Sequence, residues 1–218
     1  IMKSILLIGM GQFGQILGEK LINMGDEVMI VDKDEDVINL LAPKYTGAVI
    51  ANCMNADNLK TLDVPSYDVC VVTIADDFQS SLEITSLLKD LGAKYVVSKA
   101  NTDIQRKFLF HVGADEVIYP NRDIAEKLAV KLNSQKVYDY IELDNEFSIF
   151  EIAVPNKWVG KTIMDVNPRG KFDLNILTIK KGNKIMPAPT ASTVFENGDK
   201  MVVFGITEKI IAFTNLKK

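Results

Sequence analysis

Apolar and polar positions follow two alternating periods over the first 135 residues. Short, nearly continuous apolar runs, such as Val69-Cys70-Val71-Val72, are typical of strands buried on both faces of a parallel sheet. Amphipathic stretches between these runs predict helices that begin near residues 12, 34, 55, 78, 102 and 121. The expected strands are 4–8, 27–31, 47–51, 68–74, 94–98 and 116–118. This alternation predicts an α/β domain built on a doubly wound parallel sheet.

The pattern changes after residue 134, where strand-like runs follow each other closely. The expected strands are 138–143, 148–154, 175–180, 184–186 and 200–204, with helices over 162–166 and 207–213. We therefore expect two domains, 1–135 and 136–218, of which the second is a small α+β domain. Asp34, Asn55 and Thr102 are the expected N-caps of three helices in the first domain.

A glycine-rich loop follows the first expected strand. Gly9, Gly11 and Gly14 form the spacing G-x-G-x-x-G, and Asp32 ends the second strand. In a Rossmann-like fold the first glycine permits a tight turn, the second lets a phosphate approach the backbone, and the third lets helix and strand pack closely. The free N–H groups of the helix attract phosphate, and a carboxylate accepts hydrogen bonds from ribose hydroxyls while repelling a 2′-phosphate. The alternative is a glycine turn that only packs, with Asp32 as a cap.

Ligands of open α/β sheets bind at the carboxyl ends of the strands. Asn52 and Cys53 follow the third expected strand, Ala75 the fourth and Lys99 the fifth. Asn52 is a candidate contact for an adenine edge, and Lys99 for a phosphate. The candidate cofactor-binding set is completed by Gln12, Phe13 and Lys33. Each of these positions is also compatible with a solvated loop residue.

Composition excludes several classes of protein. The formal net charge of −4 argues against a nucleic-acid partner, because duplex binding needs a basic face. Two cysteines, Cys53 and Cys70, and one histidine, His111, do not make an ordinary zinc site, so we expect no metal. No apolar run approaches the ~18–20 residues of a membrane span. A reducing, cytoplasmic location suits this cysteine usage.

A dehydrogenase needs an acid or base beside its nicotinamide and a domain that holds substrate. The last 83 residues contain no histidine, and His111 precedes Gly113 at an expected helix end. We therefore expect a binding protein with no catalytic residues, with a small NAD-dependent oxidoreductase as the alternative.

Taken together, these motifs resemble the RCK family, the regulators of potassium conductance. The first-domain motifs that carry the resemblance are 9–14, Asp32, 49–52, 98–101 and 112–120, and the second-domain motifs are 158–163, 175–180, 187–189 and 198–205. The similarity covers both domains and is closest to soluble KtrA/TrkA-type subunits of bacterial potassium uptake systems.

The resemblance implies a cytoplasmic, nucleotide-sensing gating subunit at the inner face of the cell membrane. Such subunits form an octameric ring of dimers beneath a potassium-translocating protein of the KtrB/TrkH type, and nucleotide binding changes the ring's shape. The helix after Pro120 should cross to a neighbouring subunit through Ile124, Leu128 and Leu132.

Two positions depart from the pattern of KtrA-like chains. Gln12 stands where an arginine usually helps to bind a triphosphate, and Asn121 stands where a glutamate lies near phosphates and a divalent cation. NAD(H), ADP or AMP therefore become more credible ligands relative to ATP.

The C-terminal domain of several relatives is a receptor for cyclic di-AMP. The matching positions in this chain are Ile163, Arg169, Asn175, Ile176 and Pro189. Asp173-Leu174 departs from a more usual Tyr-Gly pair beside them. The alternative is that the two isoleucines are core, Pro189 is a turn residue and Arg169 is solvated.

Overall fold

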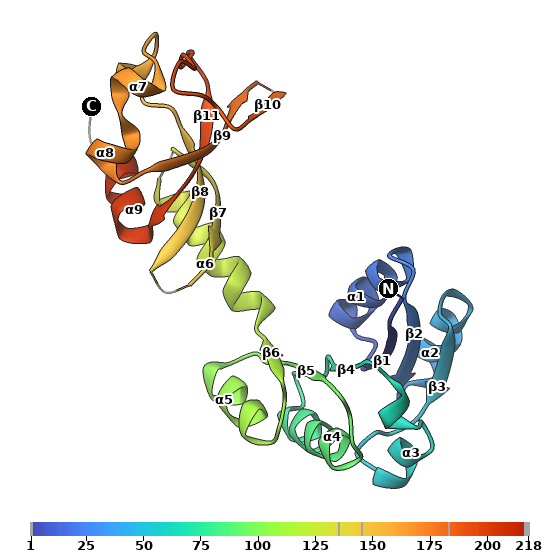
Figure 1. Cartoon of the computed structure of the whole chain (residues 1–218). Helices are drawn as coiled ribbons and strands as arrows, with labels where there is room; N and C mark the ends of the chain where they lie inside the picture. The colour runs from blue at the N-terminus through green and yellow to red at the C-terminus, as the bar shows by residue number, and fades with distance from the viewer. Residues whose placement is uncertain (1, 135, 145, 183, 216–218) are drawn as a thin grey trace. The chain divides into compact units, whose positions relative to one another are not determined.

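The computed structural model describes residues 2–134, 136–144, 146–182 and 184–215. The chain divides into two compact units, Ile1–Arg122 and Asp123–Lys218 (Figure 1). This division falls within the first turn of helix α6 (Pro120–Asn133), so most of that helix belongs to the second unit. Residue 135, the expected end of the first domain, lies outside the described residues.

The first unit is built on a six-stranded sheet in the order β3-β2-β1-β4-β5-β6, with every pair parallel. This strand order is that of a doubly wound dinucleotide-binding fold, and it confirms the Rossmann-like sheet expected from the sequence. The strands are β1 (Ser4–Ile8), β2 (Glu27–Asp32), β3 (Gly47–Ile50), β4 (Val69–Val72), β5 (Val96–Lys99) and β6 (Glu116–Ile118). The helices before α6 are α1 (Gln12–Asn23), α2 (Glu35–Leu41), α3 (Ala56–Lys60), α4 (Phe78–Asp90) and α5 (Asp103–His111), with short 3₁₀ turns η1 (Ala42–Lys44) and η2 (Val64–Ser66).

The apolar strands are buried on both faces because helices pack on each side of the sheet. In β1, Leu6 and Ile8 pack in a cluster with α4, whereas Ile5 and Leu7 pack in a cluster with α2. The three expected N-caps are confirmed, since the side chains of Asp34, Asn55 and Thr102 each accept a backbone N–H of the following helix.

The second unit is a five-stranded antiparallel sheet in the order β10-β9-β11-β8-β7. Its strands are β7 (Val137–Glu142), β8 (Phe147–Ala153), β9 (Asn175–Lys181), β10 (Lys184–Pro187) and β11 (Lys200–Ile206). The other elements are η3 (Asn156–Trp158), α7 (Ile163–Val166), α8 (Pro168–Phe172) and α9 (Thr207–Asn215). An α+β architecture was expected here, but α8 was not. Its start signal is Asn167, whose side-chain oxygen accepts the N–H of Gly170, followed by Pro168 at the first helical position.

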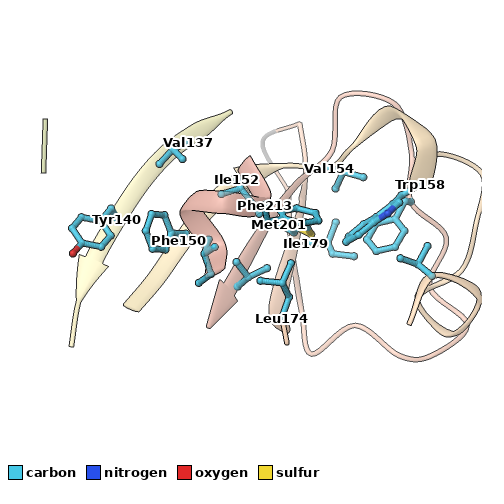
Figure 2. Packing of buried hydrophobic residues seen from close by; sticks show 14 residues of the cluster. Val137, Tyr140, Phe150, Ile152, Val154, Trp158, Leu174, Ile179, Met201 and Phe213 are labelled. Carbon is cyan, nitrogen blue, oxygen red and sulfur yellow. The ribbon is translucent and has the colours of Figure 1, made fainter. Parts of the chain in front are cut away.

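One apolar cluster fills this unit. Every second residue of β8, including Phe150 and Ile152, points to the same side of the sheet (Figure 2). Trp158 of η3 packs with its ring centroid 5.4 Å from that of Phe213, which fixes α9 against η3 (Figure 2). Among the described residues, no helix is long and apolar enough to cross a membrane.

Candidate functional site

A cleft of about 320 Å³ opens at the carboxyl ends of β1 to β4. This is the edge of the sheet at which open α/β folds bind ligands, and the volume lies in the range of small-molecule sites. Of the candidate residues, the structure brings seven to its wall, namely Gly9, Gly11, Asp32, Lys33, Asn52, Cys53 and Ala75.

Backbone conformation and packing within the domain require glycine at two positions of the loop. Gly9 has a left-handed φ of 94°, and a Cβ there would lie 2.7 Å from Ile74. A Cβ at Gly14 would lie 2.2 Å from the carbonyl oxygen of Gly9. Both positions therefore exclude other residues for reasons of packing, as the motif predicts for the turn and for the contact between helix and strand.

Packing within the protein does not require glycine at position 11. Its φ of −65° is open to any residue, and a Cβ at this position would meet nothing within 4 Å. Gly11 is the N-cap of α1 and offers no side chain to the first N–H groups of the helix. The loop thus presents bare backbone and the positive end of a helix toward the cleft, which suits a phosphate.

Asp32 connects the end of β2 to the glycine loop. Its Oδ2 accepts the N–H of Met10 at 2.6 Å, and its Oδ1 accepts the N–H of Asp34 at 3.0 Å. A carboxylate has about four acceptor positions, so each oxygen can still accept a ribose hydroxyl. Asp32 is therefore both a structural cap and a free acceptor, two roles that the sequence presented as alternatives.

The other wall residues differ in what they can offer. Asn52 is exposed and uses its Oδ1 to accept the N–H of Met54, which leaves its amide N–H₂ toward the cleft. Burial, with a smaller contribution from the charge of Asp32, raises the pKa of the Cys53 thiol to about 12. A thiol that stays protonated is a poor nucleophile, so Cys53 contributes shape rather than chemistry.

Four candidate residues do not line the cleft wall: Gln12, Phe13, Gly14 and Lys99. The first three form the first turn of α1 and can act through their backbone N–H groups. Lys99 lies with its Nζ 5.6 Å from the centre of the Phe13 ring, so its charge is held beside that turn.

The sequence missed Thr73, Asp77 and Ser80, all of which line the cleft. The expected strand 68–74 ends two residues early, at Val72, which pairs with Ile8 at the end of β1, and the Thr73 hydroxyl then donates to the carbonyl oxygen of Gly9 in the glycine loop. Asp77 caps α4, and hydrogen bonds from Ser80 lower the pKa of its carboxyl group. The Asp-x-x-Ser spacing before an apolar run is a sequence signal that could have located this pair.

Metal ligands and the histidine side chain are further sources of chemistry for a cleft of this kind. Within the described residues, no group of three or more His, Cys, Asp or Glu side chains is arranged to hold a metal ion. The exposed imidazole of His111 bonds through Nδ1 to the carbonyl of Lys107 in its own helix.

A second hollow, about 470 Å³ in volume, lies in the C-terminal unit and is here named the Arg169 pocket. The structure brings all five candidate residues of that unit to it: Ile163, Arg169, Asn175, Ile176 and Pro189. In the part of the chain that the structure describes, the Arg169 guanidinium has no hydrogen-bond or ion-pair partner. Its five donors are therefore available to an anion.

The class of protein is a Rossmann-type nucleotide-binding domain followed by a small antiparallel domain. It is defined by the strand order of the first sheet, by the glycine loop and by Asp32 at the end of β2. The TrkA-N domain family matches residues 5–120, and the TrkA-C domain family matches residues 147–218. The chain therefore belongs to the family of RCK-type potassium uptake proteins that carry TrkA-N and TrkA-C domains.

Relatives of similar length support this membership. The chain is 35% identical over 211 residues to the Ktr system potassium uptake protein C of Bacillus subtilis. This match covers 97% of the chain and 96% of the relative. The chain is 31% identical over 208 residues to the Ktr system potassium uptake protein A of Vibrio alginolyticus, and this match covers 95% of the chain and 94% of the relative. These relatives are named as potassium uptake proteins, which confirms the non-enzymatic class expected from the sequence.

Solved structures share the fold at low sequence identity. A "GsuK channel bound to NAD" aligns over 100% of this chain and 40% of its own, with a TM-score of 0.70 and 16% identity. An AMP-bound Kef C-terminal domain from Shewanella denitrificans aligns over 60% of this chain and 79% of its own, with a TM-score of 0.52 and 20% identity.

Substituting the two loop glycines should separate folding from binding. Gly14→Val should lower the free energy of unfolding by about 3 kcal/mol, because its side chain overlaps the Gly9 carbonyl. Gly11→Val should lower it by less than about 1 kcal/mol yet abolish nucleotide binding, because its side chain points into open space where a phosphate would lie. Urea unfolding and calorimetry measure the two effects. Unchanged nucleotide affinity in Gly11→Val would place the phosphates elsewhere.

Proposed function

We propose that this chain is a cytoplasmic gating subunit of a Ktr/Trk-type potassium uptake system, with an adenine nucleotide or NAD(H) as the signal. The observation that carries the proposal is the cleft in which Gly11 and Asp32 meet, one open to phosphate and the other to ribose. A nucleotide that binds one conformation of the subunit more tightly shifts its equilibrium, and a membrane partner registers the shift.

The carboxylates of the cleft wall limit which nucleotides can bind. Asp32 repels the 2′-phosphate of NADP, and Asp76 and Asp77 add two carboxylates to the wall. Structures that share this fold are named as bound to NAD, ADP and AMP. With Gln12 rather than arginine at the first turn of α1, position 12 offers no charge to a third phosphate. We therefore expect ATP to bind no better than ADP, and magnesium to add little.

Asp32→Ala should weaken binding of adenosine nucleotides by roughly 1.5–3 kcal/mol, because a charged hydrogen-bond acceptor is lost. Asp32→Asn keeps an acceptor for the Met10 amide and separates the loss of charge from the loss of loop structure. Asp90→Ala is the matched control, since Asp90 is exposed at the end of α4 and does not line the cleft. Calorimetry with AMP, ADP, ATP, NAD and NADH measures the affinities.

Equal affinities in wild type and both Asp32 variants would show that the nucleotide does not use this cleft. Mass spectrometry of nucleotides released from the purified chain identifies the ligand that it carries. The coupling to transport is tested separately, by growth at low potassium of cells that lack other uptake systems and express this chain with a KtrB- or TrkH-type subunit.

A ring of eight subunits needs an apolar surface that the single chain leaves exposed. Ile124, Leu128 and Leu132 are each four positions from the next on α6 and are 67%, 51% and 76% exposed. Side chains at this spacing form one stripe of a helix. We propose that a second copy of the chain covers the stripe and that paired copies assemble into the octamer beneath the membrane protein.

Leu128→Glu should reduce the assembly to smaller species, because a carboxylate in an apolar interface is unpaired and desolvated. Ala129→Glu, on an exposed position outside the stripe, is the control and should leave the mass unchanged. Light scattering at micromolar concentration measures the mass with and without nucleotide. If the wild-type chain is a monomer with and without nucleotide, the proposed ring is contradicted.

The Arg169 pocket suits an anionic ligand with apolar rings, and we propose cyclic di-AMP. Arg169 can form two hydrogen bonds to a phosphate, Asn175 can bridge phosphate or base, and Ile163, Ile176 and Pro189 can wall the adenine. A ligand with two equivalent halves matches a two-fold interface, which presents the same pocket twice.

Arg169→Ala combined with Asn175→Ala should weaken cyclic di-AMP binding by at least about 2 kcal/mol, since charge-assisted hydrogen bonds are lost. Lys171→Ala removes a positive charge from the same helix without touching the pocket and should have little effect. Calorimetry on the full chain, with NAD present to fill the first cleft, measures the change. If a folded wild-type chain gives no heat at tens of micromolar cyclic di-AMP, this ligand does not bind the pocket.

A further inference from the structure

The nucleotide cleft occupies only part of the crevice that its fold provides. In a sheet of this strand order, a dinucleotide lies across the carboxyl ends of the strands, with its adenosine half over β1 to β3 and its other half over β4 to β6. All the lining residues of the cleft belong to the segment from Ile8 to Ile84, which ends before β5. The cleft therefore covers the adenosine half and reaches Asp76, in the loop after β4.

A hydrogen bond ties this wall of the cleft to the next loop of the sheet. Nδ2 of Asn101, in the loop after β5, donates to Oδ1 of Asp76 at 3.0 Å, and this bond is here named the Asn101 latch. A second contact starts from the same strand end, because Nζ of Lys99 lies 5.6 Å from the centre of the Phe13 ring at the start of α1. Both contacts span the carboxyl ends of β4 and β5, where folds of this class hold the second half of a dinucleotide.

Helix caps hold both partners of the latch in place. Asp77, next to Asp76 in the chain, caps α4 through its side chain. On the other side, the N–H of Asn101 donates to Oε1 of Gln105 at 2.7 Å, and Thr102 caps α5. Neither loop has to become ordered before the latch forms, so little conformational entropy opposes it.

The hydrogen bonding of the latch is incomplete. Oδ1 of Asn101 is buried and has no hydrogen-bond partner among the described residues. The carboxylate of Asp76 accepts and cannot donate, so it fixes the amide of Asn101 with Nδ2 toward it. A buried acceptor without a donor is unfavourable, which offsets part of what the contact with Asp76 contributes. The latch can therefore open for a ligand with enough binding energy, and its effect is selectivity rather than exclusion.

We propose that Asn101 and Asp76 set the specificity of the cleft for single adenine nucleotides over dinucleotides. An adenosine mono- or diphosphate lies between Asp32 and the glycine loop and leaves the latch closed. The nicotinamide half of NAD has to open the latch, and the lost hydrogen bond subtracts from the affinity of NAD alone. This inference rests on the proposed nucleotide cleft and names the class of ligand that the cleft prefers.

Other roles of the same two side chains lead to different expectations. If the hydrogen bond only stabilises the two loops, its loss lowers the affinity for every nucleotide or for none. If the charge of Asp76 acts alone, its removal relieves repulsion most for the more negatively charged ligand, which is ADP rather than NAD. Of the three roles, only the latch predicts that its loss favours NAD over ADP.

The test uses the full chain and four variants. Asn101→Ala breaks the latch from outside the cleft wall, and Asp76→Ala breaks it from the wall itself. Asp76→Asn removes the charge but keeps an acceptor for Asn101. Gln79→Ala is the matched control, since it removes an exposed amide that donates to Glu83 on α4 and does not line the cleft.

Calorimetry with ADP and with NAD measures both affinities of each variant. Wild type should bind ADP at least as tightly as NAD. Asn101→Ala should bind NAD about 5-fold tighter, because no hydrogen bond has to be broken, and ADP as wild type does. The ratio of NAD affinity to ADP affinity should be about 5-fold higher in Asp76→Ala than in Asp76→Asn, which keeps the latch. This second comparison decides the matter if Asn101→Ala does not fold. Gln79→Ala should bind both ligands as wild type does.

The outcomes separate the latch from the cleft itself. If wild type binds neither ADP nor NAD, the proposed nucleotide site fails and the latch fails with it. If ADP binds but the ratio is the same in wild type, Asn101→Ala and Asp76→Ala, the site stands and the latch is wrong. Weaker binding of both ligands to Asn101→Ala, or a wild-type preference for NAD, would also contradict the latch.

Discussion

The hydrogen bond from the Met10 N–H to the Asp32 carboxylate joins the glycine loop to the second strand, and the nucleotide cleft depends on it. The loop between β1 and α1 contains three glycines within six residues, and glycine-rich backbone has many conformations open to it. Asp32 holds one end of this loop, and the Thr73 hydroxyl holds the Gly9 carbonyl from the other side. The start of α1 is thereby presented in a single orientation, which lowers the entropy that a phosphate must remove on binding.

Elements of the first unit were predictable from the sequence because each has a local cause. Continuous apolar runs need burial on two faces, and side-chain caps such as Asp34 act within three residues. The ends of strands were less predictable. β4 ends opposite the end of β1, where Thr73 donates to Gly9, 64 positions away in the chain, and no local pattern contains that information. Gly11 could be identified from the motif, but only the structure shows that it lacks a packing role.

In the second unit, the residues of the Arg169 pocket were found through resemblance, and the structure places them around one hollow. The ion pair between Lys209 and Asp173 could not be predicted in this way, because the two residues lie 36 positions apart in the chain. Helix α8 was missed for a related reason, since five residues that include Pro168 and Gly170 have weak helix propensity. Contacts with Trp158 and Phe213, made through Phe172, override that propensity.

Burial of the two thiols limits their reactivity. Cys53 lies in the wall of the nucleotide cleft and Cys70 in the centre of β4, and burial raises the pKa of each thiol to about 12. Oxidants and electrophiles react with thiolate, and near neutral pH the ionised fraction of such a thiol is on the order of 10⁻⁴ or below. Peroxides and disulfides should therefore leave these two thiols reduced. Any response of the protein to the redox state of a cell would then come through the ligand bound in the cleft and not through its cysteines.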